Sequence, residues 1–189
     1  STATLPSANS AAKNDIYKSK GGAAERFYIS SNNFYNVIYS AGRTGSNTYI
    51  INAAATLSQA IDTNTFINLN VNTTGNITLI SNSVVVPNAG SQNINSNSIS
   101  GTFAKAAGGT VTLFTSSASS VSGSTINNNN NNFSNITVTG STIITGWFNT
   151  DAGASTKRIQ NNIFSNWSAG TGSVNGMNVN ITGTNNATS

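Results

Sequence analysis

Short apolar groups recur along the whole chain, and each group is bounded by Gly, Asn or Ser. Their β-branched and aromatic residues are typical of β-strands. Only residues 10–19 favour a short helix, with Ser10 as the N-cap and glycines after the last turn. The chain is therefore expected to consist of many short strands. Representative groups lie at 49–51, 77–80, 84–86, 111–114 and 143–144.

A longer pattern, Ile-x-x-Asn-x-Phe-x-Asn, occurs five times, although the copy at 94–101 has Ile99 for Phe and Gly101 for the second Asn. The copy around residue 131 departs from it, because Asn128 stands where the first Ile is expected and Ile126 lies two residues earlier. The apolar anchors of the pattern follow one another at steps of 32, 33, 34 and 31 residues. These anchors, called the anchor column below, are Phe34, Phe66, Ile99, Phe133 and Phe164. The Asn residues two positions before them, called the asparagine ladder, are Asn32, Asn64, Asn97, Asn131 and Asn162.

A constant step of this length, with short strands in each repeat, predicts a solenoid. The expected fold is all-β, a parallel β-helix of about five coils of roughly 32 residues. Equivalent strands would stack about 4.8 Å apart, with the anchor column inside. The asparagine ladder would lie inside a turn, where each amide bonds to the next and where Asn tolerates a left-handed backbone. A second row, Asn36, Asn68, Asn135 and Asn166, is interrupted at Gly101.

On these repeats the sequence resembles the right-handed parallel β-helix, or pectin-lyase-like, family. The stretch from Thr125 to Ile181 also resembles the Asn/Thr-rich β-strand-repeat surface proteins exported by Bacteroidetes. The resemblance implies a secreted or cell-surface location. It also implies that an enzyme of this family would carry clustered Asp with Arg or Lys on one outer sheet.

Composition narrows the chemistry. The chain has 33 Asn, no His and no Cys, and only 6% of its residues are charged. These counts argue against the usual zinc and haem sites and against Cys or His nucleophiles, so no cofactor or metal is expected. The cations form no run that could track phosphates, so no nucleic-acid partner is expected. No segment has the roughly 20 apolar residues of a membrane span.

The carboxylates are few and dispersed. Asp62 and Asp151 are nearly three coils apart, about 13 Å along the axis, whereas paired-carboxylate catalysis needs a separation of roughly 5–10 Å. Asp151 is interpreted as a turn residue, and Lys157 with Arg158 as a solvated pair at a strand edge. These positions favour a chain that is not an enzyme.

The candidates for stacking on a sugar are aromatic side chains, namely Trp147, Trp167, Tyr35, Tyr39 and Tyr49. Trp147, Tyr39 and Tyr49 are the tentative ligand-binding residues, and Trp147 is the best of them because it has no counterpart in other coils. Trp167 follows an Asn where other coils have Val, Leu or Ile, so it is interpreted as structural.

Three functions remain open. The first is a non-enzymatic structural or adhesive segment of an exported surface protein, which binds a surface glycan or assembles with itself. The second is a carbohydrate-active β-helix enzyme, either a polysaccharide lyase or a glycosidase, or a fragment of one. The third is an ice-binding solenoid, suggested by Thr137 and Thr139, although that pair does not repeat at the coil step.

Two regions are expected along the chain. Residues 1–28 would form an N-terminal cap or linker, and residues 29–189 the β-helix domain, itself part of a longer chain. A solenoid exposes unpaired strand edges at its last coil. The C-terminal coil is therefore expected to meet a further coil, a second copy or a partner protein.

Overall fold

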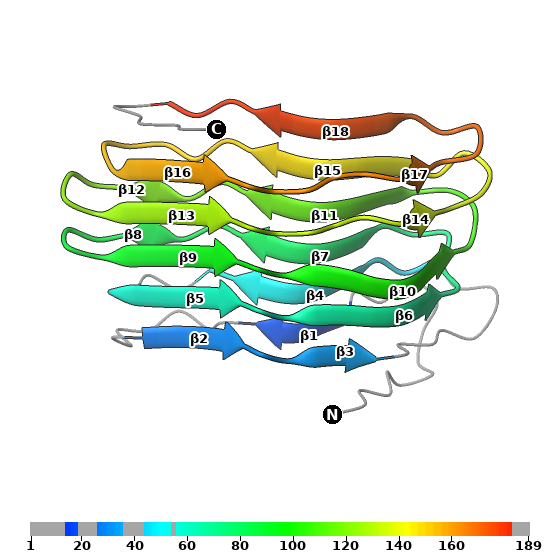
Figure 1. Ribbon diagram of the computed structural model, residues 1–189, viewed down its shortest axis with the longest axis horizontal. Helices are drawn as coiled ribbons and strands as arrows, with labels where there is room; N and C mark the ends of the chain where they lie inside the picture. The colour runs from blue at the N-terminus through cyan, green and yellow to red at the C-terminus, as the bar shows by residue number, and fades with distance from the viewer. Residues whose placement is uncertain (1–13, 19–25, 36–43, 54–55, 183–189) are drawn as a thin grey trace.

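The computed structural model describes residues 14–18, 26–35, 44–53 and 56–182. Every regular element in this part of the chain is a β-strand, and parallel strands stack into a solenoid of about four turns (Figure 1). The predicted all-β parallel β-helix is confirmed. Five motif copies enclose only four intervals from one coil to the next. The structure therefore has about four full turns, although five coils were expected.

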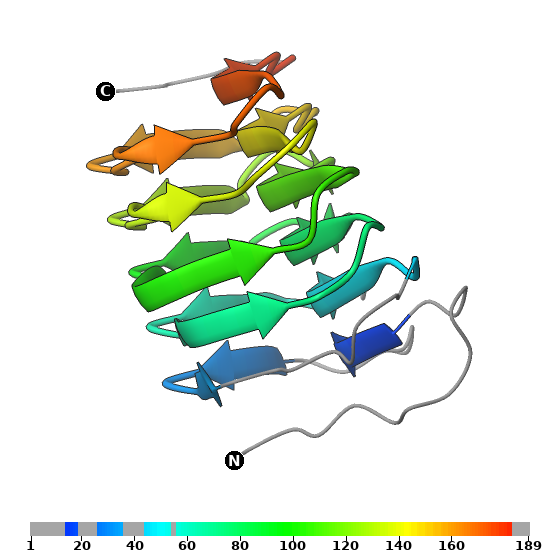
Figure 2. The same cartoon turned by 90° about the vertical axis from the view of Figure 1, so that its right-hand side faces the viewer.

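One wall of the solenoid is a parallel six-stranded sheet, seen edge-on with the other walls in Figure 2. Its first strand corrects the sequence analysis, because residues 14–18 pair with the next coil as a strand and are not helical. In order, its strands are β1 (Asn14–Lys18), β4 (Asn47–Asn52), β7 (Ile77–Asn82), β11 (Thr110–Ser116), β15 (Ile143–Asn149) and β18 (Val174–Val179).

The opposite wall is built from smaller sheets, all of them parallel between neighbouring coils. A five-stranded sheet contains β2 (Arg26–Ser30), β5 (Ser58–Asp62), β9 (Ser91–Asn95), β13 (Thr125–Asn129) and β16 (Thr156–Gln160). A three-stranded sheet contains β3 (Asn33–Tyr35), β6 (Thr65–Val71) and β10 (Ser98–Lys105). Two short pairs complete the coils, β8 (Val85–Val86) with β12 (Ser119–Ser120), and β14 (Ile136–Thr137) with β17 (Trp167–Ser168).

The asparagine ladder lies at the turn between the five-stranded and three-stranded sheets, as predicted. Asn64 donates both its backbone N–H and its Nδ2 to Oδ1 of Asn97, at 3.1 and 3.0 Å. Asn97 repeats both bonds to Asn131, each at 3.0 Å, and the pattern runs from Asn32 to Asn162. Each Asn from Asn64 onward also donates Nδ2 to a main-chain oxygen in the preceding coil.

The left-handed residue of this turn is not the ladder Asn itself, as the sequence analysis had assumed. It is the residue just before it, and even the β-branched Thr63 has a φ of 56° there. The ladder holds the turn in every coil, and this accounts for a backbone that such residues rarely adopt. The residues concerned are Ser31, Thr63, Ser96, Asn130 and Asn161.

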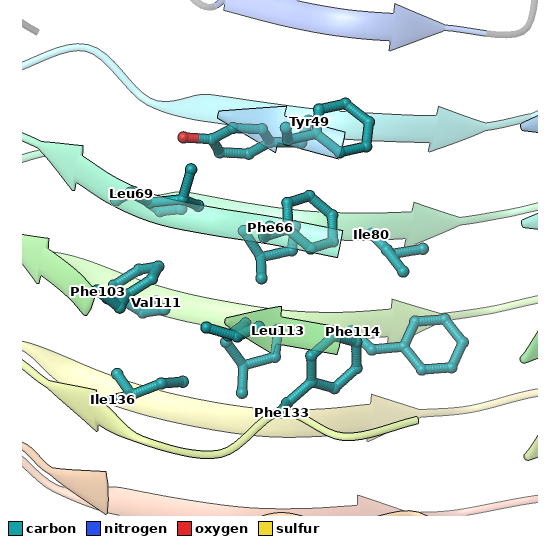
Figure 3. Packing of buried hydrophobic residues seen from close by; sticks show 14 of the residues in the cluster. Tyr49, Phe66, Leu69, Ile80, Phe103, Val111, Leu113, Phe114, Phe133 and Ile136 are labelled. Atoms are coloured by element: carbon teal, nitrogen blue, oxygen red, sulfur yellow. The ribbon is translucent and has the colours of Figure 1, made fainter. Parts of the chain in front are cut away.

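The anchor column forms the middle of the core (Figure 3). Phe66 is fully buried, stacks on Phe34 with ring centroids 4.8 Å apart, and meets Tyr49 edge-on across the core at 5.6 Å. Aliphatic residues of the six-stranded sheet, such as Ile80 and Leu113, close the core from the other wall.

A second ladder of polar side chains, called the internal polar ladder below, crosses the interior where β4, β7 and β11 end. Asn52 donates Nδ2 to Asn82 Oδ1 at 3.0 Å, and Asn82 donates Nδ2 to Ser116 Oγ at 2.9 Å. Cross-links at 3.0 and 3.2 Å join Asn52 to Gln59 and Asn82 to Gln92. This ladder was not predicted from the sequence, and it gives the buried amides partners in neighbouring coils.

Asn128 departs from the motif without disturbing the register. It lies in the inward column of Ile61 and Ile94, whereas Ile126 takes the inward position held by Gln92 one coil earlier. Polar and apolar side chains have thus exchanged places in this coil. Gln92 Nε2 still reaches Asn128 Oδ1 at 3.2 Å, so the exchange stays connected to the polar ladder.

The second Asn row occupies left-handed positions, with φ of 49° at Asn68, 63° at Asn135 and 56° at Asn166. Gly101 interrupts it at a bulge, where the register between β10 and β6 shifts between Ser100 and Phe103. A Cβ on Gly101 would lie 2.1 Å from Asn68 Oδ1, so the Asn68 side chain fills the place of a side chain there. Asn36 lies outside the described residues.

Candidate functional site

The aromatic residues proposed for ligand binding do not form a surface. Trp147 is 1% exposed and stacks on Phe114 with centroids 5.1 Å apart, and Tyr49 is fully buried against Phe34 and Phe66. The prediction that these two rings bind a ligand at the surface is therefore wrong. Tyr39 lies outside the described residues.

Asp151 is a buried structural group. It is 1% exposed, and its Oδ1 accepts hydrogen bonds from Ser116 Oγ at 2.6 Å and from the Ala118 N–H at 2.7 Å. Asn149 Nδ2 donates to its Oδ2 at 3.0 Å. Burial raises the pKa of Asp151, although these hydrogen bonds and nearby Lys157 oppose the shift. Asp151, which was interpreted from the sequence as a turn residue, thus lies at the end of the internal polar ladder.

Lys157 does not lie in solvent as the sequence analysis expected. Its side chain is 1% exposed and donates Nζ to the Gly153 carbonyl at 2.6 Å, whereas Arg158 beside it is exposed. Burial lowers the pKa of Lys157, and the negative charge of Asp151 opposes this. Successive side chains of a strand point to opposite faces, so Lys157 points inward and Arg158 points outward.

Asp62 lies on the outer face of β5, in a different environment from Asp151. Its Oδ1 accepts the Asn95 N–H at 2.9 Å, and Asn95 Oδ1 in turn accepts the Asn129 N–H at 2.9 Å. Partial burial raises the pKa of Asp62, and the bond from Asn95 opposes the shift. Asp62 therefore begins an outer row of side-chain oxygens, each of which accepts a main-chain N–H of the next coil. Its side chain faces away from the interior that holds Asp151.

A buried lysine holds the corner after β10. Lys105 is 6% exposed and donates Nζ to the carbonyls of Thr73 and Ala106, both at 3.0 Å, and to that of Gly108. Burial lowers its pKa to about 8. The ammonium group thus satisfies three main-chain oxygens where the strand leaves the sheet.

The six-stranded sheet carries a column of threonines on its outer face. Thr48, Thr78, Thr112 and Thr145 are register partners in successive strands, about 4.8 Å apart from strand to strand. Thr78, Thr112 and Thr145 are half-buried between buried neighbours, so they point outward. No short sequence motif marks this column, whose steps are 30, 34 and 33 residues, so it was not predicted.

Several apolar and aromatic side chains are open to solvent, and of the predicted candidates Tyr35 is among them. Tyr28 is 55% exposed and Tyr35 is 40% exposed in the first coil, and Phe148 is 43% exposed on the outer face of β15. The Tyr28 hydroxyl lies 2.9 Å from Ser58 Oγ, which fixes the ring against the next coil. These rings are the ones that could stack on a ligand.

Comparisons with protein families, with curated proteins and with solved structures found no match. The described part of the chain contains no helix long and apolar enough to cross a membrane. Within the same residues, no three Asp or Glu side chains gather where they could hold a metal ion.

Proposed function

We propose that the chain is a non-enzymatic structural segment of an exported cell-surface protein, a stiff spacer with an almost uncharged polar surface. The observation that carries the proposal is the unbroken asparagine ladder from Asn32 to Asn162. The same pair of hydrogen bonds joins neighbouring coils at four successive junctions, so the solenoid resists bending and separation of its coils. The internal polar ladder adds a second set of links.

The placement of the acidic groups supports a non-catalytic role. Both oxygens of Asp151 accept hydrogen bonds inside the core, and Asp62 caps a main-chain N–H on the outer face. General acid–base chemistry on a sugar needs two carboxyl groups that face one substrate. Asp62 lies on the outer face of β5 in the five-stranded sheet, whereas Asp151 lies in the interior just after β15 of the six-stranded sheet, so the two do not face one substrate.

An adhesive role for the surface rests on its exposed rings. Tyr28 and Tyr35 are exposed in the first coil, and their hydroxyls lie 2.9 Å from Ser58 Oγ and 3.3 Å from Asn33 Nδ2, a setting in which an aromatic face can stack on a sugar ring. We propose a surface glycan as the ligand of these residues.

One experiment tests both parts of the proposal. The chain is screened on a panel of polysaccharides for binding and for release of new chain ends, beside Tyr28→Ala and Asp62→Asn. Binding that Tyr28→Ala weakens, without turnover, supports the adhesive segment. Turnover that is lost in Asp62→Asn would establish an enzyme and refute the proposal.

The threonine column favours ice binding as a second candidate. Three half-buried Thr residues, Thr78, Thr112 and Thr145, repeat about every 4.8 Å on one parallel sheet and present a regular, uncharged row to water, whereas Thr48 at the start of the column is buried. Thermal hysteresis tests this candidate directly. Thr112→Lys should abolish it and Thr137→Lys, an exposed Thr outside the column, should not. Absence of hysteresis in the unaltered chain would exclude this role.

A further inference from the structure

Three reactive side chains lie in the interior of the coil that contains β15 and β16. Asn149 is the last residue of β15, Lys157 is the second residue of β16, and Asp151 lies in the connection between them. Each of these side chains is 1% exposed. A carboxamide, a carboxyl group and an amine are thus enclosed together, away from water.

The strand register places Lys157 opposite Asn149. Two inward columns face each other across the interior, and these two residues are their members in one coil. In the two coils that carry Asn in one column and Gln in the other, Asn Nδ2 donates to Gln Oε1 at 3.0 and 3.2 Å. Lysine is longer than glutamine, so a lysine at the Gln position reaches the Asn position as well. The first column is Asn52, Asn82, Ser116 and Asn149, and the second is Gln59, Gln92, Ile126 and Lys157.

The Lys157 amine is held close to Asp151. Its Nζ donates to the carbonyl of Gly153, which lies in the same connection as Asp151, at 2.6 Å. Lys157 and Asp151 are near enough for each charge to shift the pKa of the other. Burial lowers the pKa of Lys157 and raises the pKa of Asp151, so it favours an uncharged amine and an uncharged carboxylic acid. An uncharged, desolvated lysine amine is a nucleophile.

Asp151 holds the Asn149 carboxamide at both ends. Its backbone N–H donates to Asn149 Oδ1 at 2.8 Å, and its Oδ2 accepts Asn149 Nδ2 at 3.0 Å. Its other oxygen is fixed by Ser116 Oγ and the Ala118 N–H. A backbone N–H aimed at a carbonyl oxygen stabilises the negative charge that develops there during attack on the carbonyl carbon. A carboxyl group in contact with the leaving nitrogen is placed to deliver a proton to it.

We propose that Lys157 and Asn149 join in an amide cross-link, which the folded chain forms by itself. Rotation about the last bonds of the lysine side chain turns Nζ from Gly153 O to Cγ of Asn149. The Nζ–Cγ bond forms, the Cγ–Nδ2 bond breaks, and the Asn149 nitrogen leaves as ammonia. Asp151 passes its proton to that nitrogen and regains a proton from Nζ, so it ends the reaction unchanged.

The cross-link ties the end of β15 in the six-stranded sheet to β16 in the five-stranded sheet. Two walls of one coil are then joined covalently, whereas hydrogen bonds join the equivalent side chains in the coils with Asn and Gln. This self-modification goes beyond the proposed structural role and suits a spacer under tension. The reaction occurs once in each chain and acts on no substrate.

The intact mass of the full chain, measured after folding and then denaturation, tests the cross-link. The unaltered chain should be lighter than its sequence by one ammonia, about 17 Da. Lys157→Met and Asp151→Asn should both keep the full mass of their sequences. Lys105→Met, which removes a buried lysine elsewhere, should lose the ammonia as the unaltered chain does.

A peptide map locates the bond in the unaltered chain and decides the matter even where a variant fails to fold. Trypsin should no longer cut after Lys157. Fragmentation of the peptide 106–158 should give no ions from single breaks between residues 149 and 157, because the cross-link holds both pieces together.

Two results would overturn the inference. One is the full sequence mass in an unaltered chain whose circular dichroism shows a folded β-protein. The other is a loss of ammonia that persists in Lys157→Met, which would assign the loss to closure of an Asn side chain on its own backbone. Neither result bears on the polysaccharide screen, so a failure here is distinguishable from a failure of the proposed function.

Discussion

Replacement of Asn97 by alanine tests most sharply whether a side chain of the asparagine ladder stabilises the fold more than an exposed polar side chain does. The Asn97 side chain is fully buried and takes part in four hydrogen bonds. It donates Nδ2 to Ile61 O at 2.7 Å and to Asn131 Oδ1 at 3.0 Å, and it accepts the two bonds from Asn64. Alanine removes all four and offers no replacement.

The cost follows from the groups left behind. The Asn64 N–H and the Ile61 carbonyl each lose a partner inside the wall, and one hydrogen of Asn64 Nδ2 loses its acceptor. A buried polar group without a partner costs about 1–3 kcal/mol, so Asn97→Ala should lower the free energy of unfolding by about 3–5 kcal/mol. Asn32→Ala removes two bonds at a half-exposed position that water can reach, and should cost under about 1 kcal/mol.

Urea unfolding followed by far-ultraviolet circular dichroism measures these differences. The matched control is Asn70→Ala, because Asn70 is exposed and its register partner in the next coil is already Ala104. This control should stay within about 0.5 kcal/mol of the unaltered chain. A cost below 1 kcal/mol at Asn97, or equal costs at Asn97 and Asn32, would refute the reasoning.

Three further outcomes are expected. Phe66→Ala should lower the free energy of unfolding in urea by about 3–5 kcal/mol, and a loss under 1 kcal/mol would mean that the anchor column does not carry the core. Gly101→Asn should cost about 1–3 kcal/mol, because the Asn68 side chain occupies the space of its Cβ; a neutral effect would contradict the bulge. The ammonium of Lys105 titrates near pH 8 when folded and near 10.5 when unfolded, so the folded chain binds fewer protons between these values. Its stability relative to Lys105→Met should therefore rise with pH in that window, by at most about 1.4 kcal/mol per pH unit, and a difference that stays flat or falls would contradict the burial.

The repeat was readable from the sequence because its two key residues, the ladder Asn and the anchor, keep a fixed spacing of two within each coil. Each must meet its own equivalent in the next coil, so both the residue types and the step are constrained. Variation of the step between 31 and 34 residues is absorbed elsewhere, as at the bulge beside Gly101. The fold and the ladder were therefore predictable before any coordinates.

The six-stranded sheet was harder to read. Trp147 lies in register with Phe114 and Met177, yet no short motif marks that column, so its burial could not be seen from its uniqueness in the sequence. The threonine column was hidden for the same reason. Lys157 is buried because alternation turns it inward and Gly153 O accepts its ammonium, a contact between residues whose placement depends on the local turn.

Engineered disulfides test the central claim, an in-register parallel solenoid, most directly, because the chain has no cysteine of its own. Asn93 of β9 and Asn127 of β13 are register partners whose side chains meet at 2.8 Å. Their Cα atoms lie about 4.8 Å apart, within the range of a disulfide. The double variant Asn93→Cys, Asn127→Cys should oxidise to an intramolecular disulfide, and Asn93→Cys with Asn129→Cys, one diagonal away, should stay reduced. A disulfide in the second pair and not in the first would contradict the account.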